Sequence, residues 1–341
     1  MEDETLADLY DVLVLLEKAF TIVTVAAVVL SVYFVQRVIK CKRIHVNFKL
    51  VLCCTAISFL LVPFFHRCIQ ILLFASERVT RRFYVNWICV VFSMLNQIFA
   101  ISSTACMVML ALVQHLAARW VRTYEEKSMS IGVCLIAFTL IYAVTISIIV
   151  NYYYLRGYDF ENSRDNCDPI AYNWQLAGLF FLGSMVICMG ASMWLMQIRK
   201  YNTRQRRAEF VTLSARYQQI DNENSAVSIT ATVVGYMTYS ALGLLGAVAR
   251  YLIVKRFGEH SAWNQVTVGY GYTLVEIYAL FHMACFIRYN RGMRRLVDRD
   301  LDRLFGSKTP KWCSVVDVSH PSLNQVEETD VYFRRLQDSW R

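Results

Sequence analysis

The sequence predicts an all-α membrane protein built as a bundle of seven transmembrane helices. Of its 341 residues, 56% are hydrophobic and only 18% are charged, whereas a soluble domain carries about 25% charged residues. The apolar residues form long blocks, and lysine and arginine gather in alternate connections between these blocks. These three observations together predict the fold class.

Seven blocks are long enough to cross the hydrocarbon core of a bilayer, which takes about 20 helical residues. We place them near 13–35, 50–75, 84–113, 129–153, 173–197, 226–253 and 263–287. The sixth block is rich in Gly, Ser and Thr, and the seventh carries Glu276 and His282, so these two are less apolar than the rest.

The distribution of Lys and Arg predicts the orientation of the bundle. On one side of the membrane, Lys and Arg number four in 36–48, three in 115–128, six in 199–225 and eight in 288–311. On the other side they number one in 1–18, three in 76–83, two in 151–172 and two in 254–262. Positive residues favour the cytoplasmic side, so we expect the N-terminus outside and the C-terminus inside. The net charge of +9 is thereby explained by topology and gives no reason to expect a nucleic-acid partner.

The two ends of the chain differ in character. Residues 1–12 form an acidic extracellular segment, unlike the basic start of a cleaved signal peptide, and 13–287 form the bundle. Residues 288–307 predict an amphipathic helix on the cytoplasmic leaflet, and 308–341 predict a polar cytoplasmic tail. The apolar face of that helix consists of Met293, Leu296, Val297, Leu301 and Leu304.

One cysteine lies in an outer connection, namely Cys167. Cys89 lies near the outer end of the third block, and the oxidising extracellular side permits a disulfide between the two. We expect Cys89–Cys167. A free Cys167, or its pairing with Cys68 near the outer end of the second block, remains open because spacing alone does not fix connectivity.

Several polar or aromatic side chains in the middle or outer parts of the blocks are candidate ligand contacts. They are His66, Asn96, Gln97, Tyr270, Tyr272 and Glu276. A carboxylate at bilayer depth costs about 2.5–3.5 kcal/mol, so Glu276 should face the bundle interior and have a partner.

Each candidate also has a purely structural interpretation. Glu276 can bond to a Tyr, Ser or Asn of a neighbouring span, and His66 with Arg67 can pair with Glu17. Asn96 and Gln97 can join helices by hydrogen bonds, and the two tyrosines can anchor the chain at the membrane interface. Arg250, at the outer end of the sixth block, is expected to reach the membrane interface and to need no function.

The connector 199–224 is the most polar stretch before the tail and holds six Lys or Arg residues. Phe210, Leu213, Tyr217 and Ile220 recur at the spacing of one helical face. This pattern is typical of a basic amphipathic helix that a cytoplasmic partner could recognise. A solvated loop whose arginines only fix the topology explains the same pattern.

Three local motifs resemble a known family. They are Ile44-His45-Val46-Asn47-Phe48-Lys49, the segment from Arg119 that ends in Thr123-Tyr124-Glu125, and Leu213-Ser214-Ala215-Arg216-Tyr217-Gln218-Gln219-Ile220-Asp221-Asn222. Together they resemble the nematode serpentine chemoreceptors of the class a superfamily (classes a, alpha-beta, b and epsilon), with classes epsilon and alpha-beta nearest. The chain departs from that family at Val113-Gln114, where an acidic-basic pair is usual, which puts the resting-state lock and basal coupling in doubt.

The resemblance implies a G-protein-coupled chemosensory receptor in the plasma membrane of sensory neurons, with the cilia as its expected location. Its partners would be a small-molecule ligand, a heterotrimeric G protein and the lipid bilayer, and dimerisation is left open. It implies G-protein-facing residues at the inner ends of the spans. These are Arg119, Arg122, Arg206, Arg207, Arg216 and Tyr217.

Other function classes remain as alternatives. A transporter or channel would predict related halves with broken helices, and no such repeat is visible. A receptor for an internal peptide or amine fits the same fold. An enzyme is not expected, and neither is a cofactor or metal, since no metal-spaced Cys/His cluster and no glycine-rich phosphate loop occurs in the sequence.

Overall fold

The computed structural model describes residues 2–41, 44–76, 82–120, 129–156, 160, 167–208, 213–258 and 261–306. All regular structure within these residues is helical. The helices are α1 (Glu2–Lys40), α2 (Val46–Ser76), α3 (Arg82–Arg119), α4 (Ser130–Tyr154), α5 (Pro169–Tyr172), α6 (Trp174–Ala208), α7 (Leu213–Phe257), α8 (Ala262–Tyr289) and α9 (Arg291–Phe305).

Within the described residues, seven helices are long and apolar enough to cross a membrane, which confirms the predicted fold class. The candidate spans are Lys18–Lys40, Val46–Leu72, Phe83–Arg119, Ser130–Tyr154, Trp174–Tyr201, Asn224–Phe257 and Trp263–Tyr289. The first span lies later in the chain than the predicted 13–35, because charged residues continue as far as Lys18. The orientation of the termini stays a prediction.

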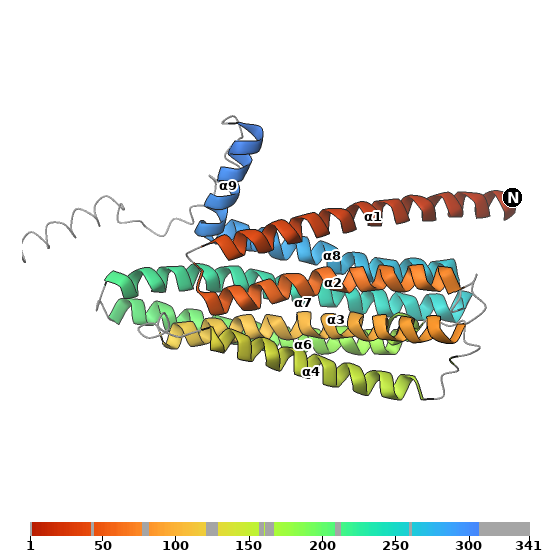
Figure 1. Ribbon diagram of the computed structural model, residues 1–341, viewed down its shortest axis with the longest axis horizontal. Coiled ribbons are helices and arrows are strands. Elements are labelled where there is room, and N and C mark those ends of the chain that lie inside the picture. Colours follow the sequence, from red (N-terminus) through yellow and green to blue (C-terminus); the bar gives the residue numbers. More distant parts are fainter. Residues whose placement is uncertain are drawn as a thin grey trace, which may run out of the picture. The chain divides into compact units, whose positions relative to one another are not determined.

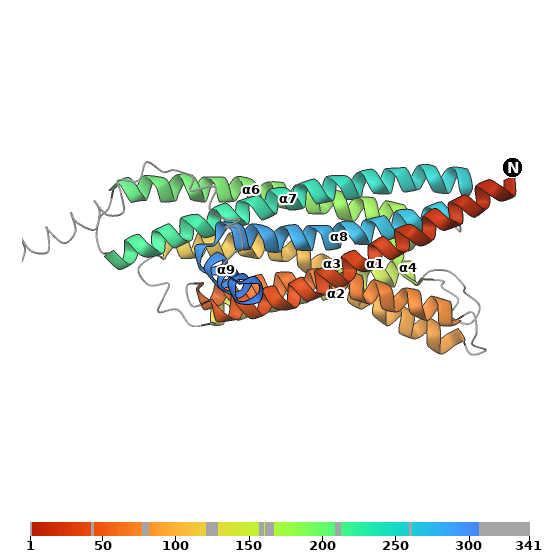
Figure 2. The same cartoon turned by 90° about the horizontal axis from the view of Figure 1, so that it is seen from above.

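The seven spans form one bundle with α3 at its centre (Figures 1 and 2). Helix α3 contacts α2, α4, α6 and α7, whereas the main contacts of α4 among the described helices are with α3, α2 and the short α5. Accordingly, 56% of the apolar window of α3 is buried but only 17% of that of α4. The structure therefore places α4 at the periphery of the bundle, with most of its surface available to lipid.

Small residues allow α4 to approach its neighbours closely. Its buried face repeats at helical spacing and consists of Gly132, Thr139, Ala143, Ser147 and Asn151. The backbone N–H of Gly132 donates to Oδ1 of Asn47 at 2.9 Å, and a Cβ atom at Gly132 would lie 3.0 Å from the Cα atom of Asn47. The His45-Val46-Asn47 motif thus joins the start of α2 to α4, which gives the motif a structural role.

Two glycines end helices where the backbone must turn into the left-handed region. Gly258 has a φ of 86° directly after α7, and Gly306 has a φ of 71° directly after α9. Glycine adopts this conformation without the steric penalty of a Cβ atom, so it commonly terminates helices.

Residues Val297–Arg341 form a compact unit of their own, distinct from Met1–Leu296. Within this second unit the described part is the end of α9, where Leu301 and Leu304 are exposed between arginines and aspartates. The described helix lies inside the range 288–307 predicted for it, and its position on the cytoplasmic leaflet stays a prediction.

Candidate functional site

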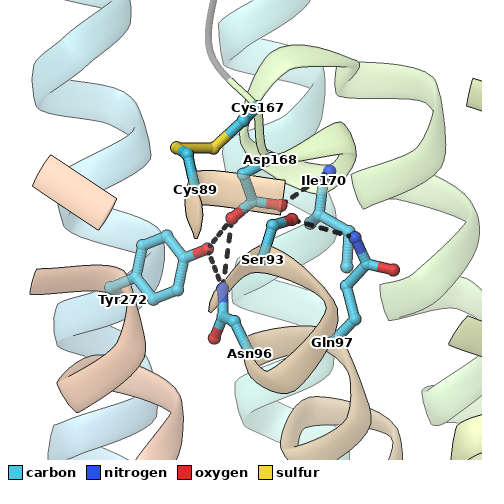
Figure 3. Close-up of a disulfide and its surroundings, with 8 residues drawn as sticks. All are labelled: Cys89, Ser93, Asn96, Gln97, Cys167, Asp168, Ile170 and Tyr272. Atoms are coloured by element: carbon cyan, nitrogen blue, oxygen red, sulfur yellow. Dashed lines mark hydrogen bonds between the residues drawn. A yellow bond between two sulfur atoms is a disulfide. The ribbon is translucent and has the colours of Figure 1, made fainter. Parts of the chain in front are cut away.

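A disulfide joins the segment before α5 to α3 (Figure 3). It links Cys89 and Cys167, whose Cα atoms are 5.9 Å apart, and this is the pair that the sequence favoured. Cys68, the alternative partner, is a free thiol. Both bonded cysteines are buried together with Ile69 and Val90 in a small apolar cluster.

Asp168 lies next to the disulfide and is fully buried, with 0% of its surface exposed. Its Oδ2 atom accepts hydrogen bonds from the Tyr272 hydroxyl at 2.8 Å and from Nδ2 of Asn96 at 3.1 Å. The same Asn96 nitrogen donates to the Tyr272 hydroxyl at 2.8 Å. Oδ1 of Asp168 accepts from the backbone N–H of Ile170 at 3.1 Å and so caps α5. One carboxylate thus joins the segment before α5 to α3 and α8 (Figure 3).

Helical spacing explains why Asp168 meets Asn96. Cys89, Ser93 and Asn96 are four and three residues apart and lie on one face of α3. The disulfide at Cys89 therefore holds Asp168, the residue after Cys167, over the same face of α3. Two side-chain donors, one from α3 and one from α8, then reach the carboxyl group of Asp168.

A pocket lies beside this network. Its empty volume is about 710 Å³, including the part that is open to the surroundings. Its walls come from α3, α6, α7 and α8, with one residue each from α2 and α5. The lining is mostly aliphatic or aromatic, with few polar groups, which is typical of small-molecule sites. The residues that matter below are Asn96, Tyr239, Arg250, Tyr270, Gly271 and Tyr272.

Arg250 lines this pocket and is only 5% exposed, which contradicts the expectation that it reaches the membrane interface. Its Nε atom donates to Oδ1 of Asn264 on α8 at 2.7 Å, and Nη1 donates to the carbonyl oxygen of Ile170 at 3.3 Å. These acceptors hold the guanidinium at the pocket wall. Sequence reasoning therefore missed a buried cation at the pocket wall.

Three of the six predicted ligand contacts line the pocket, namely Asn96, Tyr270 and Tyr272. His66 does not line it but stacks flat on the ring of Tyr272, with centroids 3.5 Å apart and an interplanar angle of 12°. The structure thus places His66 where it supports a pocket residue. No side chain of Glu17 is described, so its proposed pairing with His66 lies outside the described atoms.

The other two predicted contacts face away from the pocket. Oε1 of Glu276 accepts a hydrogen bond from the Thr24 hydroxyl of α1 at 2.6 Å, so its partner is a threonine rather than the Tyr, Ser or Asn expected. Gln97 belongs to a network between α3 and α4, in which its Oε1 accepts from Nδ2 of Asn151 at 2.8 Å. Both residues join helices in this structure.

A layer of three tyrosine rings, Tyr236, Tyr239 and Tyr278, adjoins the pocket through Tyr239. Tyr239 lines the pocket, and its ring is 5.1 Å from that of Tyr236 and 5.5 Å from that of Tyr278, measured between centroids. The hydroxyl of Tyr236 shares a 2.7 Å hydrogen bond with Thr104 of α3, and that of Tyr278 donates to the carbonyl oxygen of Thr232 at 2.9 Å. The layer therefore connects α3, α7 and α8, and no sequence motif pointed to it.

The predicted G-protein-facing residues are described only in part. Arg119 is exposed at the end of α3, whereas Arg122 lies outside the described residues. The backbone is helical at Arg206, Arg207, Arg216 and Tyr217, but their side chains are not described. Val113 and Gln114, the departure from the family pattern, are both buried in the bundle.

No group of three or more His, Cys, Asp or Glu side chains that could hold a metal ion occurs among the described residues. The described pocket offers an apolar wall with a buried arginine and a buried amide.

Residues 5–317 match the family model of the serpentine type 7TM GPCR receptor class ab chemoreceptors. The match covers nearly the whole chain and confirms the family resemblance read from the three motifs, with class alpha-beta as the class that is matched. This family is a class of receptors and not a family of enzymes. No curated protein matches the chain.

Proposed function

Because the chain belongs to the class ab family of serpentine seven-transmembrane chemoreceptors, we propose that it binds an extracellular small molecule in the outer pocket and signals through a heterotrimeric G protein. The observation that carries this proposal is the pocket between α3, α6, α7 and α8 with its buried Arg250. By the same resemblance we place the receptor in the plasma membrane of sensory neurons, at their cilia.

The construction of the pocket supports small-molecule binding. Gly243, Gly246 and Gly271 contribute no side chains to the walls, while Phe180 and Phe181 contribute large apolar surfaces. A molecule that buries apolar surface there gains about 25 cal/mol per Å². The few polar groups at the wall can fix its orientation.

The contacts below the pocket support signalling. A ligand can favour one of two bundle conformations only through contacts that differ between them. Tyr239 would contact both the ligand and the aromatic layer, and its neighbour Tyr236 is bonded to Thr104 on the central helix. A shift of the Tyr239 ring would therefore move residues on α3, α7 and α8 together.

The inner ends of α6 and α7 support coupling to a G protein. Helix α6 continues past its span to Ala208, and α7 begins at Leu213, well before its span starts at Asn224. These extensions carry Arg206, Arg207 and Arg216. We propose that their movement opens a groove for the C-terminal helix of a Gα subunit.

The pocket is tested by filling it. Gly271 lines the pocket, and a Cβ atom there would meet nothing within 4 Å, so Gly271→Phe should occupy ligand space without disturbing the fold. In cells that report G-protein activation, we expect this variant to need at least tenfold more of any activating small molecule. Gly183→Phe, which is equally open but does not line the pocket, is the matched control. Equal responses of the two variants at equal surface expression would contradict the assignment.

The inner face is tested by removing its charge. Replacing Arg206, Arg207 and Arg216 together by alanine should abolish signalling and leave surface expression intact. Ligand binding to the outer pocket should survive in this variant. A triple variant that still signals like the parent receptor would refute the coupling surface.

A further inference from the structure

A second hollow, of about 720 Å³ counted with its open part, lies at the end of the bundle opposite the disulfide. It is formed where α3 ends and where the α6 span ends at Tyr201. Its walls include His115 and Arg119 of α3 together with Trp194 and Tyr201 of α6. We call it the α3–α6 groove.

The groove has a buried floor and exposed walls. Its floor includes Ala118 of α3 and Ile198 of α6, which both belong to the hydrophobic core. Arg119 and Tyr201 are exposed, and Arg119 lies about 180° around α3 from the core residue Leu110, since successive residues turn by about 100° around a helix. The groove is therefore open to the surroundings of the bundle at these side chains.

The chemistry of the groove suits an anion at the membrane interface. Arg119 is exposed and makes no hydrogen bond or ion pair with another described residue. His115, about one helical turn before Arg119, also lines the groove, and its ring centroid lies 5.2 Å from that of Trp194. Tryptophan and tyrosine side chains with one apolar and one polar end prefer the depth of lipid headgroups.

We propose that the α3–α6 groove binds the headgroup of an anionic phospholipid of the inner leaflet. Arg119 donates to the phosphate, because a guanidinium forms strong charge-assisted bonds with phosphate oxygens. Trp194 and Tyr201 cover the glycerol region, and the acyl chains lie along the exposed apolar face of α6 that includes Met193. The negative potential of the cytoplasmic leaflet favours this occupant.

This assignment gives Arg119 a different partner from the G protein that the sequence suggested. A Gα helix would enter from the aqueous side between the inner ends of the bundle, whereas Trp194 and Tyr201 give the groove the side chains of a membrane interface. The lipid site requires neither the cue nor the G protein, and it shares with the proposed function only the predicted orientation of the bundle.

The test is native mass spectrometry of the full-length receptor in a neutral detergent, titrated with dioctanoyl phosphatidylserine and dioctanoyl phosphatidylcholine. We expect one phosphatidylserine to bind in preference, and Arg119→Gln to weaken its binding about tenfold, the loss of one charge-assisted bond. Arg119→Lys should restore part of the affinity. Arg288→Gln removes an exposed arginine at the end of α8 and should leave binding unchanged.

Four results would overturn the proposal. The first is equal binding of the two lipids, and the second is an equal loss in Arg288→Gln and Arg119→Gln, which would show unspecific attraction. The third is displacement of phosphatidylserine by millimolar inorganic phosphate, which would show a simple anion site. The fourth is normal lipid binding of Arg119→Gln with loss of G-protein activation, which would make Arg119 a protein contact.

Discussion

Following the predicted orientation, we call the half of the bundle that carries the disulfide the outer half and the opposite half the inner half, and different side-chain interactions dominate in the two. At the outer end, side chains of different segments are hydrogen-bonded to one another, as in Asp168–Tyr272 and Arg250–Asn264, and a disulfide closes the structure. In the inner half, aromatic rings such as Phe34 and Phe286 contact each other within a large apolar cluster that extends as far as the pocket residue Tyr239. Directional bonds fix the outer geometry. In the inner half a hydrogen bond from Gly132 to Asn47 joins α4 to α2, but the ring contacts around Phe34 and Phe286 can slide and re-form.

His282 shows the character of the inner half most clearly. It is fully buried, and neither ring nitrogen has a hydrogen-bond partner among the described residues. Its ring lies 5.1 Å from that of Phe286, 6.0 Å from that of Phe59 and 6.3 Å from that of Phe34. No directional bond must break for these rings to repack, so this region suits the movement that the proposed ligand binding would cause.

Breaking the disulfide should have the largest effect on the outer half. Cys89→Ser should lower the free energy of unfolding by about 2–5 kcal/mol, the usual cost of losing a native disulfide. The segment that carries Asp168 would no longer be held over Asn96, so the response to ligand should be lost too. A thermal melt of the receptor in detergent and a dose–response curve measure both effects.

The controls for the disulfide come from the same chain. The double variant, Cys89→Ser with Cys167→Ser, should have about the same free energy of unfolding as Cys89→Ser alone, because each of the two variants lacks the same single disulfide. Cys68→Ser, which removes a free thiol, should melt close to the parent receptor. Additive losses in the double variant would show that the cysteines act separately.

A smaller effect should come from the Asp168–Tyr272 hydrogen bond. A double-mutant cycle with Asp168→Asn and Tyr272→Phe should give a coupling energy of about 0.5–3 kcal/mol, as expected for residues in direct contact. The same cycle between Asp168→Asn and Tyr278→Phe, which are not in contact with each other, should give a value near zero. Equal coupling energies in the two cycles would show that the Asp168–Tyr272 value does not come from their direct hydrogen bond.

The smallest effect, with the opposite sign, should come from His282. A buried polar group without a partner costs about 1–3 kcal/mol, so His282→Leu should be neutral or raise the melting temperature. Tyr278→Phe is the comparison, since it removes a hydroxyl that does have a partner and should cost about 0.5–1.5 kcal/mol. A marked destabilisation by His282→Leu would show that the inner half depends on polar contacts as well.

The sequence was sufficient for the features that depend on length, composition and motif. Apolar blocks of about 20 residues specify spans, and seven are found in the described part of the chain. A carboxylate at bilayer depth needs a partner, so the sequence predicted that Glu276 faces the bundle interior. It did not predict that the partner is Thr24. Which residue of a neighbouring span stands opposite depends on helix rotation, and spacing within one helix does not determine it.

Asp168 and Arg250 were missed for different reasons. Asp168 stands before Pro169, a typical helix start, and next to Cys167, so its capping role and its place over α3 could have been inferred. Arg250 gave no such signal. An arginine near a span end usually extends to the interface, and only the presence of Asn264 and the Ile170 carbonyl oxygen turns it inward.

The orientation of the bundle is the central claim on which the pocket, the inner arginines and the lipid groove all depend. We would place one epitope at the N-terminus and another after Arg341, and stain intact and permeabilised cells. The account predicts that the N-terminal epitope is stained on intact cells and the C-terminal one only after permeabilisation. The reverse pattern, or both epitopes on the same side, would contradict it and bring a transporter or channel forward instead.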